Sequence, residues 1–507
     1  MKYQIFSLLF LISNINSHAP HIMRCKRVDS SEMSFKMELS YDDVLLIPKK
    51  FPLNSRNDIS TRTRVTKNLY INAPIISSNM DTVTEADMAI KIAQLGGVGI
   101  IHRFNTAEDQ VWEVKKVKRF SSSNARIENP IKIHLNKSIS EAKDLMADNN
   151  ITSLLILDDE NKLAGILTSR DMRFAKSTEK ISEIMTPKHK LIVAYSDITI
   201  DDAINILKNH RLEKLPLITK DWEVAGLITS KDIENKSIYP NASLDSKSRL
   251  LVGAAIGVKE DAIERAKALV DAGADILVID VAHGHSDVVI ELIKTIKTKF
   301  PDVELIAGNV ATAAGTRDLI EAGADAIKVG VGPGSICTTR ITTGSGYPQL
   351  SAIIHCAQEA DKFGIPVIAD GGIKYSGDIT KAIAAGASTV MLGSLLAGTE
   401  ESPGQAFIKE GKKYKVIRGM ASFGAHLGRA ARGNENKTEN FTPEGVEAVV
   451  PYRGQVSEVL SQLMGGLRSG LSYCGATCIE DARGKCNFIK ISSAGMRESK
   501  AHDVDVK

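Results

Sequence analysis

Short hydrophobic runs alternate with stretches of helical periodicity along most of the chain. Each run is nearly continuous in apolar residues, which is typical of parallel strands that are buried on both faces. The runs lie at 73–77, 98–102, 251–256, 276–280, 304–308, 326–330, 366–370 and 389–393. Because eight such strands with intervening helices fit a closed barrel better than an open sheet, the pattern predicts an α/β fold of the (β/α)8 (TIM) barrel class.

The junctions between the predicted helices and strands repeat one motif. Residues 271–275 read Asp-Ala-Gly-Ala-Asp, 321–325 read Glu-Ala-Gly-Ala-Asp and 385–388 read Ala-Gly-Ala-Ser. A glycine at the end of a helix can adopt a positive φ and stop the helix, after which the chain can turn into a strand. The motif therefore predicts three helix ends, each directly before a buried strand.

An insert at 129–239 separates the second predicted strand from the third, and it contains a tandem repeat. Ile-Leu-Thr-Ser-Arg-Asp-Met at 166–172 matches Leu-Ile-Thr-Ser-Lys-Asp-Ile at 227–233, and the same offset aligns further residues before them without a gap. A constant offset indicates two copies of one small unit. The predicted organisation has an N-terminal extension at 1–32 and a barrel in two segments, at 33–128 and 240–507. The insert at 129–239 separates the two barrel segments.

Composition and charge narrow the function classes. A chain of 507 residues with 43% hydrophobic and 25% charged residues suits a globular protein with a barrel and an insert. The formal net charge of +3 is close to balance, so it gives no argument for a nucleic-acid or membrane partner. Six cysteines at irregular spacings do not resemble a secreted disulfide scaffold, which favours a cytoplasmic location.

The N-terminus complicates that location. Lys2 and the apolar run at 5–12 resemble a short secretory signal, although the run is too short to span a bilayer. The alternative is an upstream extension, with the functional chain starting near Met33 or Met37. We prefer the extension, because the composition and the cysteines of the chain downstream are typical of a cytosolic protein.

A glycine-rich loop with a cysteine follows the sixth predicted strand. Residues 330–340 read Gly-Val-Gly-Pro-Gly-Ser-Ile-Cys-Thr-Thr-Arg. Glycines let backbone N–H groups approach an anion, and a TIM barrel carries its catalytic groups at this end of its strands. A thiolate is a good nucleophile for an electrophilic ring carbon. The loop therefore predicts Cys337 as a nucleophile beside an anion site.

Carboxylates at other strand ends indicate nucleotide binding. Asp370-Gly-Gly ends the seventh strand and Gly393-Ser ends the eighth, where barrels often build a phosphate site. Asp370 is suited to accept hydrogen bonds from ribose hydroxyls, and Asp280 at the end of the fourth strand offers a second carboxylate. Two such carboxylates predict two nucleotides. His283 and His285 are either acid–base groups or polar loop residues.

Several segments together resemble motifs of the IMP dehydrogenase and GMP reductase superfamily. They are Gly-Pro-Gly-Ser-Ile-Cys-Thr-Thr-Arg at 332–340, Ala-Gly-Asn-Val at 307–310, Ile-Ala-Asp-Gly-Gly-Ile at 368–373, Ser-Asn-Met-Asp-Thr-Val-Thr at 78–84 and Gly-Gly-Leu-Arg-Ser at 465–469. The resemblance runs from about residue 39 to 504. The insert resembles a pair of CBS modules, which commonly bind adenine or guanine nucleotides.

The resemblance implies an oxidation of IMP by NAD in which Cys337 attacks C2 of the purine and the hydride passes to NAD. Thr339 would lie beside the reacting carbon, and Arg432 would activate water for hydrolysis. The implied IMP contacts are Ser78, Met80, Gly332, Ser335, Asp370, Gly371, Gly372, Gly393, Ser394, Gly419, Met420 and Glu444. The implied NAD contacts are Asp280, Asn309 and Gly330.

The resemblance also implies a potassium ion, a homotetramer and a regulatory insert. Potassium would bind carbonyl oxygens of Gly332, Gly334 and Cys337, with a segment near Glu498 and Ser499 from a neighbouring subunit completing the site. In the insert, the positions that match nucleotide contacts, for ATP or GTP, are Thr168, Asp171, Thr229 and Asp232. The alternative is an insert that binds no ligand and serves dimerisation.

The predicted flap, at about 420–450, departs from the family pattern. In the family it carries an Arg-Tyr pair, but no tyrosine follows Arg429 or Arg432, and Ile417 and Ala421 replace the more usual Tyr and Gly. GMP reductase, which releases ammonia from GMP and uses NADPH, needs no such arginine and is the alternative. A nucleotide-sensing protein with an inactive barrel is a more remote one. The insert, the long flap and the C-terminal tail favour the dehydrogenase.

Overall fold

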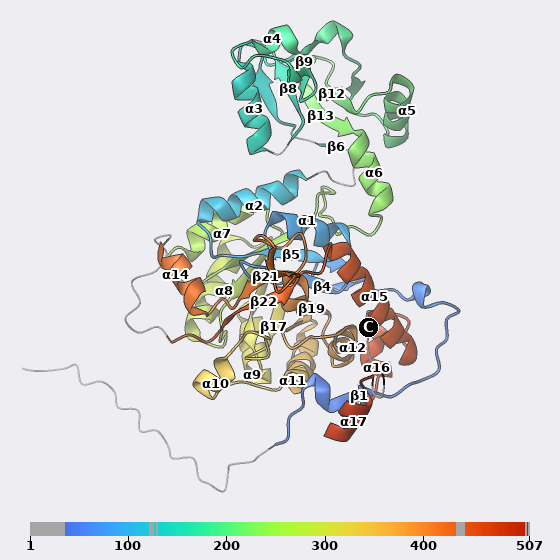
Figure 1. Ribbon diagram of the computed structural model, residues 1–507, viewed down its shortest axis with the longest axis vertical. Coiled ribbons are helices and arrows are strands. Elements are labelled where there is room, and N and C mark those ends of the chain that lie inside the picture. Colours follow the sequence, from blue (N-terminus) through green and yellow to red (C-terminus); the bar gives the residue numbers. More distant parts are fainter. Residues whose placement is uncertain are drawn as a thin grey trace, which may run out of the picture. The chain divides into compact units, whose positions relative to one another are not determined.

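Eight parallel strands close into a barrel with helices around it (Figure 1). The computed structural model describes residues 36–120, 126–127, 130–149, 151–431, 442–501 and 504. The barrel strands are β4 (Ile75–Ser77), β5 (Val98–Ile101), β14 (Val252–Ile256), β15 (Ile276–Asp280), β16 (Glu304–Val310), β17 (Ala326–Val329), β18 (Val367–Asp370) and β19 (Thr389–Leu392). Since β19 pairs with β4, the sheet has no free edge. The predicted barrel is confirmed.

The helices between the strands are α1 (Ala86–Gln94), α2 (Ala107–Arg119), α7 (Ala262–Asp271), α8 (Asp287–Lys299), α9 (Ala313–Glu321), α10 (Thr339–Thr343), α11 (Gln349–Ala360) and α12 (Ser376–Ala384), with α13 (Ser394–Ala397) and α15 (Val456–Tyr473) after the last strand. The predicted glycine stops are confirmed. Gly273, Gly323 and Gly386 have φ angles of +97°, +114° and +117°, directly after α7, α9 and α12. Each places the following strand on its course into the barrel.

All eight predicted strands are present; β15 has the predicted bounds, and the other seven differ by one or two residues at one end. Five of them end or begin one residue inside the predicted run, and β16 extends to Val310. Gly330 and Gly393 were predicted as strand ends, but both lie outside the strands. Here the chain leaves the ladder to form the loops that follow β17 and β19.

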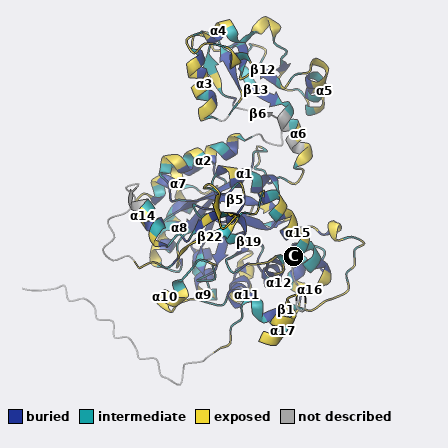
Figure 2. Ribbon diagram, in the orientation of Figure 1, coloured by how far each residue is buried: buried dark blue, intermediate teal, exposed yellow. Residues whose placement is uncertain are grey.

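The barrel strands are buried (Figure 2), and residues along each strand alternate between the barrel interior and the layer of helices. Ile276, Val278, Ala326 and Ile368 belong to a cluster inside the barrel, with a hairpin of β2 (Thr63–Arg64) and β3 (Tyr70–Ile71) adding to it. Their neighbours, such as Leu277 and Ile327, pack in the larger cluster that contains helix residues. The two clusters explain why the strand sequences are apolar almost without interruption.

The insert consists of two sheets with matching elements. One sheet has the order β10-β9-β8-β7 and the other β11-β12-β13-β6. The short strands are β7 (Lys132–His134) and β10 (Thr186–Pro187) in the first sheet and β6 (Arg126–Ile127) and β11 (Ala194–Tyr195) in the second. The long strands are β8 (Ser153–Leu157) and β9 (Leu163–Thr168) in the first repeat and β12 (Lys214–Ile218) and β13 (Val224–Thr229) in the second. Helices α3 (Ile139–Asp148) and α5 (Ile200–His210) occupy equivalent places. The sequence repeat is therefore also a structural repeat.

A three-stranded sheet carries the flap. It contains β20 (Phe407–Lys409), β21 (Lys412–Arg418) and β22 (Glu447–Pro451), and β21 pairs antiparallel with β22 so that Arg418 lies opposite Glu447. Between them the chain forms α14 (Phe423–Ala431) and then returns to the site near residue 444. The stem fixes where both limbs of the flap begin.

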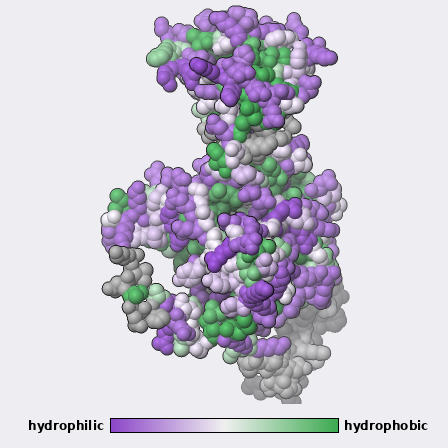
Figure 3. Space-filling view, turned by 90° about the vertical axis from the view of Figure 1, so that its right-hand side faces the viewer, coloured by the Kyte–Doolittle hydropathy of each residue, from purple (hydrophilic) through white to green (hydrophobic). Residues whose placement is uncertain are grey.

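Hydrophilic residues cover most of the face seen in Figure 3, with smaller hydrophobic patches between them. Among the described residues, no helix combines the length and the apolar character that a membrane crossing requires.

Candidate active site

The loop after β17 depends on its glycines. Gly332 has a φ of +81°, and a Cβ there would lie 2.5 Å from Cγ of Arg340. A Cβ on Gly330 would lie 2.1 Å from the carbonyl oxygen of Asp370, at the end of the adjacent strand β18. Only glycine fits such close approaches. The loop is therefore held against β18, with Cys337 at the C-terminal end of the barrel.

Cys337, Thr339 and Glu444 form a continuous chain of hydrogen bonds. The thiol of Cys337 donates to Oγ1 of Thr339 over 3.1 Å, and this hydroxyl donates to Oε2 of Glu444 over 2.8 Å. All three side chains are partly exposed. A carboxylate acceptor makes the second bond a charge-assisted one. The arrangement connects the sulfur to a proton acceptor through one hydroxyl.

The returning limb of the flap is attached to the cysteine loop by its backbone. The N–H of Thr338 donates to the carbonyl of Glu444 over 2.8 Å, and the N–H of Val446 donates to the carbonyl of Ile336 over 3.0 Å. Gly445 lies between these bonds, where a Cβ would come within 3.3 Å of the Ile336 oxygen. The backbone thus places the Glu444 carboxylate against Thr339.

A buried lysine on β17 joins residues near the ends of β15, β16 and β18. Lys328 on β17 donates to Oδ1 of Asp280 over 2.6 Å and to Oδ2 of Asp370 over 2.8 Å, and it also donates to Oδ1 of Asn309. The amide of Asn309 donates to Oδ2 of Asp370 over 3.0 Å, and the amide of Asn79 donates to Oδ2 of Asp280 over 2.8 Å. The two predicted ribose carboxylates therefore belong to one network.

The charges in this network stabilise one another. Burial lowers the pKa of a lysine, but Asp280 and Asp370 outweigh that effect and raise the pKa of Lys328 above its ordinary value. Burial likewise favours a raised pKa for Asp280, and the Lys328 cation outweighs it, so the pKa lies below its ordinary value. Both groups are charged at neutral pH.

Residues predicted to contact the phosphate and the purine of IMP lie in the loops at the same strand ends. A Cβ on Gly393 would lie 3.1 Å from Sδ of Met80 and 3.9 Å from Cβ of Ser78. A Cβ on Gly371 would lie 3.2 Å from the backbone nitrogen of Gly334. The loops after β4, β17, β18 and β19 are thus brought together at one end of the barrel.

A protein-family model and several known proteins match nearly the whole chain. The family model described as "IMP dehydrogenase / GMP reductase domain" matches residues 38–502. The chain belongs to the IMP dehydrogenase / GMP reductase family. It is 52% identical over 477 residues to inosine-5'-monophosphate dehydrogenase of Nitrosopumilus maritimus, an alignment that covers 93% of this chain and 99% of the relative. It is also 48% identical to GMP reductase of Leishmania major, over 92% of this chain and 97% of that protein.

A solved structure of a family member has the same fold. A GMP reductase variant from Trypanosoma brucei, in complex with guanosine 5'-monophosphate, is 43% identical and superimposes with a TM-score of 0.88. The match covers 94% of this chain and 100% of that one. This chain therefore shares its fold with a GMP reductase over nearly its whole length.

Some predicted site residues are not brought to the Cys337 loop, or lie outside the described residues. Arg432 lies outside them. Glu498 ends α17 (Ser493–Glu498), and Ser499 follows it, donating from Oγ to the carbonyl of Gly495 over 2.8 Å. In this chain α17 contacts the 3-10 helix η2 (Tyr41–Asp43).

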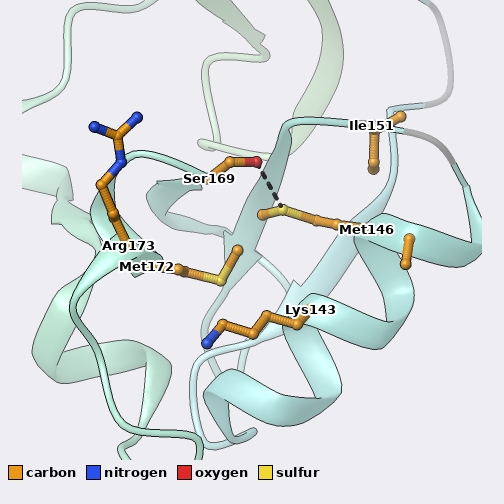
Figure 4. Close-up of a pocket in the computed structure, with 7 residues that line it drawn as sticks. Lys143, Met146, Ile151, Ser169, Met172 and Arg173 are labelled. Atoms are coloured by element: carbon orange, nitrogen blue, oxygen red, sulfur yellow. Dashed lines mark hydrogen bonds between the residues drawn. The ribbon is translucent and has the colours of Figure 1, made fainter.

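In the insert, two of the predicted nucleotide contacts bond to each other. The N–H and the hydroxyl of Thr168 donate to Oδ2 of Asp171 over 2.8 Å and 2.7 Å. Thr229 ends β13 in the equivalent place, and the side chain of Asp232 lies outside the described residues. A cavity of about 450 Å³ lies in the first repeat, between α3 and the turn after β9 (Figure 4). None of the residues that line it belongs to the Cys337 loop. It is lined by Lys143, Met146, Ala147, Ile151, Ser169, Met172 and Arg173.

The sequence interpretation missed two members of the strand-end network. Lys328 was assigned only to an apolar strand run, and Asn79 only to a motif. The alternation along β17 was the available signal, because Ala326 faces the barrel interior and Lys328, two residues later, must face it too. A lysine at an interior position requires buried acidic partners.

Proposed function

We propose that the protein is an NAD-dependent IMP dehydrogenase, which oxidises inosine 5'-monophosphate to xanthosine 5'-monophosphate in guanine nucleotide biosynthesis. The observation that carries the proposal is the hydrogen-bonded chain from Cys337 through Thr339 to Glu444 at the catalytic end of the barrel. Relatives named IMP dehydrogenase, 52% and 50% identical over more than nine-tenths of the chain, support it.

Cys337 is the nucleophile of this reaction. The thiol releases its proton to solvent, its sulfur bonds to C2 of the hypoxanthine ring, and the hydrogen at C2 leaves as a hydride, for which NAD would be the acceptor when bound. The product on the cysteine is a thioimidate, and water must then add to C2 and release the thiol. The loop that holds Cys337 is fixed on one side by β18 and on the other by the flap limb.

Thr339 and Glu444 activate the water for that hydrolysis. Once the sulfur is bonded to the purine it carries no proton, so Oγ1 of Thr339 is free to accept a proton from water while it donates to Glu444. Arg432 is the second candidate for the base, from the family resemblance. Glu444 is the better group, since a free arginine has a pKa above about 12 and is a poor base.

The IMP site is assigned to the strand-end loops. Asp370 holds the ribose hydroxyls, and glycine N–H groups of the loops bind the phosphate. The remaining residues proposed to contact IMP are Ser78, Met80, Gly332, Ser335, Gly371, Gly372, Gly393, Ser394, Gly419 and Met420.

The NAD site is assigned to Asp280, Asn309 and Gly330. Asp280 suits a ribose because its carboxylate is ionised, one-fifth exposed and beside the exposed residues Ala282 and His283. Asn309 donates to the carbonyl of Gly330 over 2.8 Å, which holds these two residues together.

A potassium ion fits the cysteine loop. No described residue donates a hydrogen bond to the carbonyl oxygens of Gly332 or Cys337, while that of Gly334 accepts one from the N–H of Cys337. Hard oxygen ligands of this kind suit such a cation. Glu498 and Ser499 from a neighbouring subunit of a homotetramer would complete the site. We also propose a cytoplasmic location, because the six cysteines at irregular spacings do not resemble a disulfide scaffold.

The insert at 129–239 is proposed to be a tandem CBS module that binds ATP or GTP. The structural repeat supports this, and so does a cavity in the first repeat with the cations Lys143 and Arg173 in its lining. The contacts assigned to the nucleotides are Thr168, Asp171, Thr229 and Asp232. A Trypanosoma brucei GMP reductase solved with guanosine 5'-triphosphate, at a TM-score of 0.77 and 38% identity, is a relative that binds such a ligand.

GMP reductase is the second candidate function. The flap sequence favours it, because no tyrosine follows Arg429 or Arg432. Initial rates with IMP plus NAD, compared with GMP plus NADPH, separate the two activities. We expect NADH formation in the first mixture. Oxidation of NADPH in the second mixture alone would make the protein a reductase.

A further inference from the structure

Lys328 is a buried cation to which the proposed reaction gives no role. Its side chain is 2% exposed, and it projects from β17 into the barrel interior, at the end where the nucleotide sites lie. Burying an unpaired ammonium is very costly, so a lysine here needs acidic partners. The structure supplies two, and they are the two carboxylates assigned to different nucleotides.

The hydrogen bonds fix the orientation of each carboxylate and leave part of it accessible to a ligand. Asp280 uses Oδ1 for Lys328 and Oδ2 for Asn79. Asp370 uses Oδ2 for both Lys328 and Asn309, while its Oδ1 accepts no hydrogen bond from any residue in the described ranges. Both carboxylates remain about one-fifth exposed. One ammonium thus fixes the two groups and leaves their outer sides to a ligand.

We propose that Lys328 is a positioning residue that links the two nucleotide sites. This inference rests on the proposed function, in which Asp370 binds the ribose of the substrate and Asp280 binds a ribose of the cofactor. Without the ammonium, the carboxylates at the ends of β15 and β18 lose the cation that they share, and Arg103 is the cation that remains near Asp280. Their repulsion and desolvation favour protonation or displacement. Loss of the Lys328 side chain therefore weakens the binding of both nucleotides, although Lys328 contacts neither of them.

Lys328→Met tests the link, with equilibrium binding of IMP and of GMP measured by calorimetry and the KM for NAD measured by initial rates. We expect the dissociation constants for IMP and GMP and the KM for NAD each to rise by about tenfold or more, because one partner of a buried charge network is lost. The variant should also lose affinity as the pH falls toward neutral, since burial raises the pKa of Asp280 and only Arg103 and the Asn79 amide then oppose that effect. The wild-type protein should hold its affinity over the same range.

Lys118→Met is the matched control. Lys118 is also buried and also bridges two carboxylates, Asp245 over 3.0 Å and Asp275 over 2.6 Å. Asp275 precedes β15, whereas Asp280 ends the same strand, so this second network lies at the opposite end of the barrel. We expect a lower melting temperature with unchanged nucleotide affinities.

A charge-balanced variant covers the case in which Lys328→Met does not fold. Asp280→Asn combined with Lys328→Met restores the net charge of the network, so it should bind IMP within about threefold of Asp280→Asn alone. Lys328→Arg, which keeps the cation, should recover most of the affinity.

The outcomes separate this inference from the proposed function. Wild-type protein that binds neither IMP nor GMP contradicts the function itself. Normal binding by the wild type together with unchanged affinities and pH dependence in Lys328→Met overturns the positioning role. A double variant that is weaker than both single variants would also overturn it, since removal of the excess negative charge would then not restore the affinity.

Discussion

Glu444→Gln is expected to stall hydrolysis while sparing hydride transfer. The carboxylate lies 2.8 Å from Oγ1 of Thr339, and a glutamine can place its amide oxygen at the same position. The substitution therefore keeps an acceptor for Thr339 and removes the group that can take up a proton. Loss of a general base costs about 10²- to 10⁴-fold in rate.

The size of the effect distinguishes this role from simple orientation. A hydrogen bond to a charged group contributes about 1.5–3 kcal/mol, which corresponds to roughly 10- to 150-fold in rate. Glu444→Ala removes both the bond and the base, so it should be slower than Glu444→Gln and should also slow the first step.

Rapid mixing with IMP and NAD provides the assay. Glu444→Gln should give a burst of NADH near one per active site, followed by slow turnover. The matched control is Glu447→Gln, three positions along the chain on β22, where the side chain is exposed, and it should turn over within about twofold of wild type. Normal steady-state turnover by Glu444→Gln would refute the assignment of the base.

Further substitutions and ligands test the remaining assignments. Cys337→Ala should abolish turnover and leave IMP binding measurable by calorimetry; substantial NADH formation would exclude Cys337 as the nucleophile. Arg432→Ala should be much slower than Arg429→Ala in hydrolysis if the arginine contributes to water activation, and equal rates would remove it from the mechanism. Replacing potassium by lithium at equal ionic strength should slow turnover through the cysteine loop, and indifference would count against the site. Deleting 129–239 and closing the gap should preserve turnover and remove any response to ATP or GTP, whereas complete loss in a folded protein would contradict a purely regulatory insert.

The fold was predictable because periodicity is a local property. Apolar runs mark strands buried on both faces, and the glycines at 273, 323 and 386 mark helix ends by their need for a positive φ. Strand ends were less accurate. Pairing stops where the chain leaves the ladder, and that depends on the neighbouring strands.

The site was predictable as a set of strand ends, but its internal contacts were not. Asp280 and Asp370 lie 90 positions apart in the numbering, and their common partner Lys328 follows only from the closed order of the barrel strands. Glu444 was assigned to IMP from its motif. Its contact with Thr339 arises from the return of the flap to the cysteine loop, which no local pattern encodes.

The stoichiometry of a complete reaction tests the central claim most directly. Purified protein is incubated with IMP and NAD in potassium buffer, and nucleotides, NADH and ammonia are quantified from the same sample. The account predicts one xanthosine 5'-monophosphate and one NADH for each IMP consumed, with no ammonia. Failure to form xanthosine 5'-monophosphate, with ammonia released from GMP in the presence of NADPH, would contradict it.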